Sequence, residues 1–129
     1  MSHLTEKLKE QKDFFARKPV SMEEINAAER ILNVVFSDEY KAYIAELGAA
    51  TIHGHELTGI CRNRNVNVVD ETTQARSITP EIPEDFYVIE NTHYDGILIW
   101  QDKEGNIYSS GSGLGVKKLA SSIEAYLKI

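Results

Sequence analysis

Residues 37–48 read SDEYKAYIAELG, and this stretch carries the start, the buried face and the end of one helix. Ser37 can cap the first turn, while the carboxylates of Asp38 and Glu39 suit the positive end of the helix dipole. Gly48 ends the helix, because glycine tolerates the left-handed backbone that helix ends commonly require. Residues at helical spacing predict the inward face: Tyr40, Ile44 and Leu47.

The same signals occur upstream, in VSMEEINAAERILN at residues 20–33. Ser21 can cap this helix, and Glu24 stands three residues later in the position of a capping box. Asn33 tolerates the left-handed conformation at the helix end. The inward stripe of this helix is Ile25, Ala28 and Leu32. An earlier helix is predicted over residues 4–17, and its apolar side consists of Leu4, Leu8 and Phe15.

After residue 48 the pattern changes toward short strands. AATIHGHELTGI (49–60) gives β-like pieces broken by glycines, and VNVVDETTQARS (66–77) can be a strand that enters a helix. DFYVIEN (85–91), GILIWQ (96–101) and NIYSS (106–110) predict strands, with the turn DKEGN between the last two. The apolar run 97–100 does not alternate, which indicates a strand covered on both faces.

LASSIEAYLKI (119–129) predicts a closing helix, with Leu119, Ile123 and either Tyr126 or Leu127 turned inward. The order of elements is therefore helices, sheet, helix. This order predicts an α+β fold in which N-terminal helices pack on a mainly antiparallel sheet with a C-terminal helix. The 129 residues, 42% of them hydrophobic and 26% charged, suit a single domain spanning 1–129.

Composition also excludes several kinds of protein. Cys61 is the single cysteine, so neither an intrachain disulfide nor a four-thiolate zinc site can form. The first residues, MSHLTEKLKEQKDFF, lack the apolar core of a signal peptide, and no stretch has the length of a membrane span. We therefore expect a cytoplasmic protein that does not bind membranes.

The net charge of −6 is concentrated in one fifth of the chain. Residues 80–104 contain seven carboxylates against Lys103 alone, and the rest of the chain is neutral. Such a surface repels nucleic acid, whose binders carry a basic footprint. It attracts a basic protein and speeds that encounter. Solvated loops around a hairpin are the alternative interpretation of the same charges.

Candidate catalytic and metal-binding residues are scattered. His53 and His55 flank a glycine and could bind zinc or iron together with His93 and Asp95, but their short connection fixes neither ring. Cys61, near two arginines, could be a nucleophile, yet no pattern places a histidine beside it. A metal- or thiol-dependent hydrolase therefore stays an alternative. We assign no catalytic, cofactor or metal residue from the sequence.

The glycine-rich stretch SSGSGLGVKK (109–118) suggests a phosphate-binding loop. Its spacing does not fit one, because Val116 stands where both the P-loop and the dinucleotide motif need a small residue. The serines in SSGS have no nucleophile-elbow pattern around them. The acidic pair Asp70 and Glu71 is of a kind common on helix surfaces. We expect the glycine-rich stretch to be a connection between a strand and the closing helix.

Residues 20–60, VSMEEINAAERILNVVFSDEYKAYIAELGAATIHGHELTGI, resemble the opening of the SUKH superfamily, which includes fungal cell-wall-assembly regulators and many bacterial immunity proteins. VVDETTQAR, FYVIENTHYDGILIW and SSIEAYL are similar to the later half of that family. The resemblance implies an α+β scaffold without a shared catalytic constellation. Bacterial members typically bind and neutralise a cognate toxin, commonly a nuclease.

Nuclease toxins tend to be basic, so the acidic segment suits such a partner. The resemblance and the charge together predict a non-enzymatic immunity protein that occludes its toxin. The alternative is a regulator or scaffold with an endogenous protein partner. For a toxin, the predicted contact residues are Glu81, Glu84, Asp85, Tyr94, Asp95, Asp102 and Glu104, with Tyr94 as an aromatic anchor.

Overall fold

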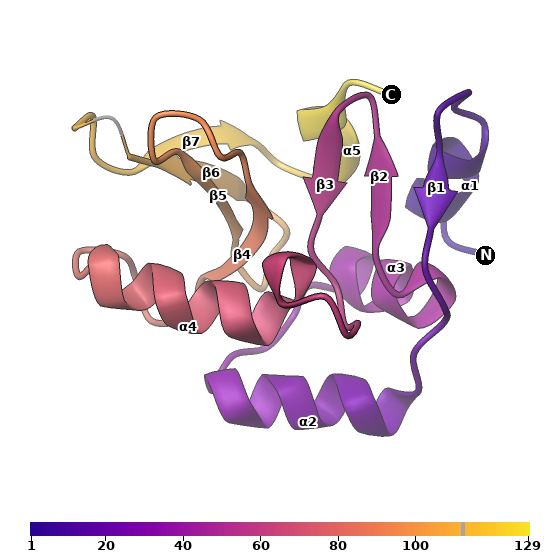
Figure 1. Cartoon of the computed structure of the whole chain (residues 1–129), viewed down its shortest axis with the longest axis horizontal. Coiled ribbons are helices and arrows are strands. Elements are labelled where there is room, and N and C mark those ends of the chain that lie inside the picture. Colours follow the sequence, from indigo (N-terminus) through magenta and orange to yellow (C-terminus); the bar gives the residue numbers. More distant parts are fainter. Residues whose placement is uncertain (112) are drawn as a thin grey trace.

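The computed structural model describes residues 1–111 and 113–129 as helices around one antiparallel sheet (Figure 1). Seven strands follow one another across the sheet in chain order, each antiparallel to the next. They are β1 (Phe15–Ala16), β2 (Ala50–Ile52), β3 (His55–Leu57), β4 (Tyr87–Asn91), β5 (Leu98–Gln101), β6 (Ile107–Ser110) and β7 (Lys117–Ala120). The α+β class and the antiparallel sheet are confirmed.

The helices are α1 (His3–Lys9), α2 (Met22–Leu32), α3 (Asp38–Leu47), α4 (Val68–Ile78) and α5 (Ile123–Leu127), with a short 3-10 helix, η1 (Arg64–Val66). Three of the helices precede β2, and α5 closes the chain, as predicted. Within the described residues, no helix combines the length and the apolar character needed to cross a bilayer.

The predicted helix caps of α2 and α3 are present. The hydroxyl of Ser21 accepts a hydrogen bond from the Glu24 amide, and that of Ser37 accepts one from the Tyr40 amide. Asn33 ends α2 in the left-handed conformation, at φ 55°. Gly48 ends α3 at φ 76°, and a Cβ there would lie 2.1 Å from the Lys18 carbonyl oxygen. Gly48 is therefore required both by its backbone angle and by this close approach.

Two element predictions are wrong. The first helix ends at Lys9, not at residue 17, and Phe15 pairs with Thr51 in the edge strand β1. Phe15 is 60% exposed, so it does not join the inward side of a helix. Residues 117–120 form β7 against β6 instead of a connection and a helix start, and Leu119 is 43% exposed. Both strands lie at the edges of the sheet. They form because they pair with a neighbouring strand, although their sequences do not alternate between apolar and polar residues.

The core has two parts, one on each face of the sheet. The larger cluster includes residues of α1, α2, α3 and α5 and one face of the strands, and the smaller one lies beneath α4 on the opposite face of β4 and β5. Residues of β4 and β5 alternate between the two: Val88, Leu98 and Trp100 contact the α4 side, while Tyr87, Ile89 and Ile99 contact the other. The predicted burial of 97–100 on both faces is thus confirmed for residues 98–100.

Candidate partner-binding surface

Residues 79–86, which we call the acidic loop, connect α4 to β4. Glu81, Glu84 and Asp85 are exposed along it. Ile82 and Phe86 are each 7% exposed and belong to the smaller core cluster. Ile82 and Phe86 thus anchor the loop on the protein, while its carboxylates face solvent.

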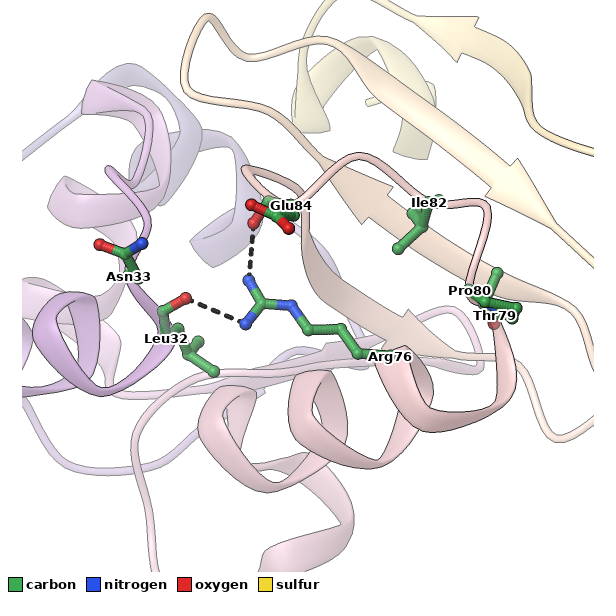
Figure 2. A pocket seen from close by; sticks show the side chains of 7 residues that line it. All are labelled: Leu32, Asn33, Arg76, Thr79, Pro80, Ile82 and Glu84. Atoms are coloured by element: carbon green, nitrogen blue, oxygen red, sulfur yellow. Dashed lines mark hydrogen bonds between the residues drawn. The ribbon is translucent and has the colours of Figure 1, made fainter.

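Arg76, near the end of α4, ties this loop to the rest of the fold (Figure 2). Its guanidinium donates hydrogen bonds to the carbonyl oxygens of Leu32, at 3.0 Å, and Glu84, at 2.8 Å. The carbonyl of Leu32 is one of those that the end of α2 leaves without a partner in the helix, so a cation is favourable there. A hollow of about 340 Å³ opens beside these contacts, between Asn33, Pro80 and Glu84. Arg76 therefore fixes the position of the acidic loop relative to α2.

Asp102, at the turn between β5 and β6, lies inside the hairpin. It is 7% exposed, and its carboxylate accepts hydrogen bonds from the amides of Glu104 and Asn106, the Asn106 side chain and the Tyr108 hydroxyl. Burial acts to raise the pKa of Asp102, but these hydrogen bonds outweigh it, so that the pKa is lowered from its usual value. Burial therefore removes Asp102 from the predicted contact residues, whereas Glu104 stays exposed.

The remaining contact candidates divide between the two ends of the β4–β5 hairpin. Tyr87 pairs with Gln101 at one end, which brings the acidic loop and the β5–β6 turn together. The pKa of Tyr108 is raised first by burial, then by its hydrogen bond to Asp102, and also by the nearby charges of Glu104 and Asp85. We call this cluster the acidic end; its exposed members are Glu81, Glu84, Asp85 and Glu104.

Tyr94 and Asp95 lie at the other end of that hairpin, in the turn between β4 and β5. Tyr94 is 71% exposed, and Asp95 has a left-handed backbone with φ 58°. A Cβ at Gly111 would lie 2.4 Å from the Gly96 oxygen, so the start of the glycine-rich stretch packs against this turn. The structure therefore places Tyr94 and Asp95 apart from the acidic end, at the opposite end of the hairpin.

His53 and His55, two of the candidate metal ligands, have other partners. His53 Nε2 lies 2.8 Å from the Gln11 side-chain oxygen, and its Nδ1 lies 3.4 Å from an Asp13 carboxylate oxygen. His55 Nδ1 lies 3.0 Å from Glu90, a carboxylate of the acidic segment that is 4% exposed. In the described parts of the chain, no three His, Cys, Asp or Glu side chains are grouped as a metal site would need.

Glu90 is a buried polar centre that the sequence does not reveal. It accepts a hydrogen bond of 2.6 Å from the Tyr126 hydroxyl of α5, in addition to its contact with His55 of β3. The pKa of Tyr126 is raised by burial and then by this carboxylate. The three side chains join β3, β4 and α5, so the Glu90 charge stabilises the interior and is not offered to a partner.

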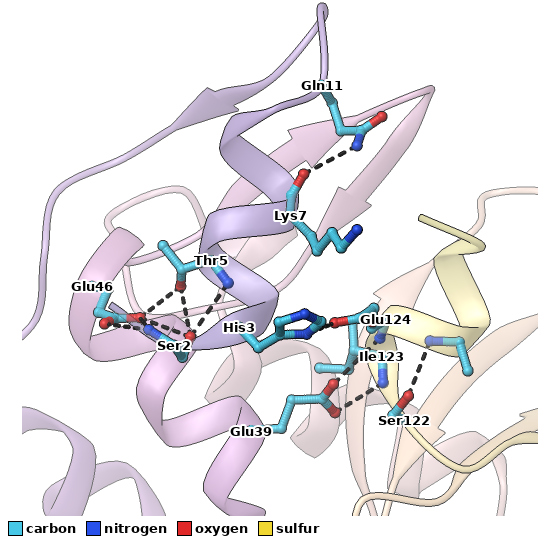
Figure 3. Close-up of polar contacts among 11 residues, drawn as sticks. Ser2, His3, Thr5, Lys7, Gln11, Glu39, Glu46, Ser122, Ile123 and Glu124 are labelled. Carbon is cyan, nitrogen blue, oxygen red and sulfur yellow. Dashed lines mark hydrogen bonds and ion pairs between the residues drawn. The ribbon is translucent and has the colours of Figure 1, made fainter.

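Two carboxylates of α3 likewise hold the ends of the chain together (Figure 3). Glu46 accepts hydrogen bonds from the Ser2 amide and the Thr5 hydroxyl of the first helical segment. Glu39 accepts hydrogen bonds from the amides of Ile123 and Glu124 at the start of α5. Both carboxylates therefore make structural contacts, and a count of charges in the sequence cannot distinguish them from carboxylates that face solvent.

The other residues considered for catalysis or phosphate binding make contacts within the fold. The Cys61 thiol lies 3.6 Å from the Asn63 carbonyl oxygen. Glu71 is 7% exposed and accepts a hydrogen bond from the Asn91 side chain, so it is not half of a surface pair with Asp70. The glycine-rich stretch connects β6 to β7; of its SSGS serines, Ser110 accepts a hydrogen bond from the Trp100 indole, and Ser112 lies outside the described residues.

Comparison with known families finds a match over nearly the whole chain. The model of SUKH_5, described as SMI1-KNR4 cell-wall, matches residues 1–128. Among curated proteins, none matches the chain. The match extends over the helices, the whole sheet and α5, including α1 and β1, which lie ahead of the region of sequence resemblance.

Proposed function

The chain belongs to the SUKH superfamily, and from this premise we propose that it is a cytoplasmic immunity protein that binds and neutralises a cognate basic toxin at the acidic end. One observation carries the proposal: Glu81, Glu84, Asp85 and Glu104 are exposed together, on a loop fixed by Arg76 and on the adjoining turn. A fixed set of like charges raises the association rate with an oppositely charged partner.

Inhibition by this surface requires binding and no turnover. The arrangement supports that interpretation, because the side chains of His53, His55, Cys61 and the buried Glu90 make contacts within the fold. Occlusion of a nuclease by an acidic face needs complementary charge and shape. It needs no catalytic group of its own.

The test uses the triple variant Glu81→Lys, Glu84→Lys, Asp85→Lys and the product of the neighbouring gene as the toxin. We expect the association rate at low salt to fall by about tenfold or more and its salt dependence to flatten. Growth rescue on co-expression is expected to weaken in parallel. The matched control reverses three exposed acids on or next to α1 and α2, Glu6→Lys, Glu10→Lys and Glu23→Lys, and should keep most of the association rate.

An association rate that is equal in the two triple variants would contradict the proposal, since both carry the same change in net charge. The relation of this family to the SMI1-KNR4 cell-wall proteins favours a second function, a regulator or scaffold for an endogenous protein of cell-wall assembly. Wild-type protein that binds an endogenous partner, and gives no growth rescue with the neighbouring gene product, would support this second function instead.

A further inference from the structure

A second surface lies at the far edge of the sheet from the acidic end, around β1. Figure 1 places β1 at one side of the molecule and the loop between α4 and β4 at the other. A groove of about 710 Å³ runs between residues 15–20 and residues 60–62. A smaller hollow of about 210 Å³ adjoins it, and Phe15 and Arg17 line both.

The groove is built by close backbone contact and not by loose loops. A Cβ at Gly48 would meet the Lys18 oxygen at 2.1 Å, and a Cβ at Gly59 would meet the Gly48 oxygen at 1.7 Å. The Ile60 amide donates a 3.0 Å hydrogen bond to that same Gly48 oxygen. Two glycines therefore let three segments stack directly, and this stacking fixes the two walls relative to each other.

The walls are basic, although the protein as a whole is acidic. Arg17, Lys18 and Arg62 line the groove, and Glu24 is the single carboxylate among its lining residues. Across residues 1–111 and 113–129, none of these three cations forms an ion pair or a side-chain hydrogen bond. Three cations without partners on a chain of net charge −6 provide electrostatic complementarity for an anionic group.

The shape and the apolar content of the groove favour a polypeptide. Six consecutive residues, 15–20, line one wall of the groove, and Ile60 adds apolar surface to the other wall. Phe15 is 60% exposed beside the cations and offers an aromatic contact. A polypeptide can present carboxylates and apolar side chains together, and this lining offers partners for both. Nucleic acid fits less well, because its binders carry an extensive basic footprint.

We propose that this groove binds an acidic segment of a partner protein, whose carboxylates meet Arg17, Lys18 and Arg62 and whose apolar side chains contact Phe15. This site is separate from the acidic end, so it is independent of toxin binding. The protein would then carry two opposed docking surfaces of opposite charge.

The test measures binding of a fluorescein-labelled peptide of sequence EVEFEVE to the full-length protein by fluorescence anisotropy. We expect a Kd of about 10–100 µM at about 50 mM NaCl and weaker binding at about 300 mM. Arg17→Glu with Arg62→Glu should weaken binding by about tenfold or more, and Phe15→Ala by a few-fold. The matched control is Lys117→Glu with Lys118→Glu on the opposite edge strand, which should change binding less than about twofold.

The outcomes separate this proposal from the toxin proposal. Unchanged peptide binding in the Glu81→Lys, Glu84→Lys, Asp85→Lys variant is expected, because that surface is distant. Absence of binding, equal losses in the two charge-reversed pairs, equal binding of the neutral peptide QVQFQVQ, or tighter binding of labelled oligothymidine would each overturn the groove proposal. None of these results tests the toxin proposal, which is tested separately by growth rescue.

Discussion

Asp102 shows how one carboxylate of the acidic segment serves the fold. Its hydrogen bonds from the Glu104 and Asn106 amides and from Tyr108 are made by the ionised form. We predict that Asp102→Asn lowers the free energy of unfolding at pH 7 by about 1–3 kcal/mol, because the charge that these donors share is lost. Urea denaturation measures this change. The control is Asp85→Asn, an exposed acid nearby, which should stay within about 0.5 kcal/mol of wild type.

The pH dependence of the same variant follows from the sign of the shift. The pKa of Asp102 is lower in the folded protein than its usual value. Its contribution is therefore present above the unfolded pKa of about 3.9, and is lost as the pH falls through the folded value. Wild-type stability should fall more steeply with acid below about pH 4 than that of Asp102→Asn. Parallel profiles for the two proteins would contradict this role.

At the same scale, the sequence predicts that the segment is acidic but not which of its carboxylates face solvent. Glu90 and Asp102 are charged residues like their neighbours, yet one is held by a tyrosine 36 residues away and the other by its own turn. The turn offered a local signal, since Asp102 precedes Gly105 in DKEGN and Asx side chains commonly accept turn amides. The Glu90 contact depends on tertiary packing and has no such signal.

At the scale of elements, Arg76 couples the end of α2 to the acidic loop. We predict that Arg76→Met lowers the free energy of unfolding by about 2–3 kcal/mol, because two carbonyl oxygens lose a charged donor. Amide hydrogen exchange of residues 80–86 should also become faster, since the loop loses its tie to α2. Arg30→Met, an exposed arginine on α2, is the control. Equal destabilisation by both substitutions would show that Arg76 acts only as surface charge.

The elements that the sequence predicts well are those whose signals are local. Caps at Ser21 and Ser37 and ends at Asn33 and Gly48 depend on residues within a few positions, and all four are confirmed. β1 and β7 were missed, because a strand of two residues and a strand beginning with two lysines lack apolar alternation. Lysines on β7 also protect an open sheet edge, so their presence there has a physical reason.

At the scale of the whole molecule, the sheet order equals the chain order, so each strand pairs with its neighbours in sequence. This local connectivity is why the fold class could be predicted from successive elements alone. The same order carries the first strand and the acidic end to opposite sides (Figure 1). The folded protein therefore has an acidic surface and a basic surface on opposite sides, whereas a count of charges along the sequence shows only the acidic segment. The basic groove could not be predicted from the sequence, because residues 17–18 and 62 come together only in the fold.

The interior around α3 carries three fully buried tyrosines, Tyr40, Tyr43 and Tyr87, whose hydroxyls form hydrogen bonds with Thr58, Gln101 and the backbone. Burial raises the pKa of each phenol, because the ionised form would be desolvated. Their contribution to stability is therefore present below the unfolded pKa of about 10 and is lost as the pH rises toward the folded values.

We predict that the protein unfolds cooperatively above about pH 11, because each buried tyrosine lowers the free energy of unfolding by up to about 1.4 kcal/mol per pH unit. Absorbance at the phenolate band and far-UV circular dichroism, followed together, measure this transition. The buried tyrosines should ionise only together with the loss of the helical signal. Tyr43→Phe should reduce the alkaline slope by about one fifth, because Tyr108 and Tyr126 also have raised pKa values and contribute with the three buried tyrosines. Ionisation of all the tyrosines near pH 10 with an unchanged dichroism signal would refute the burial of these hydroxyls.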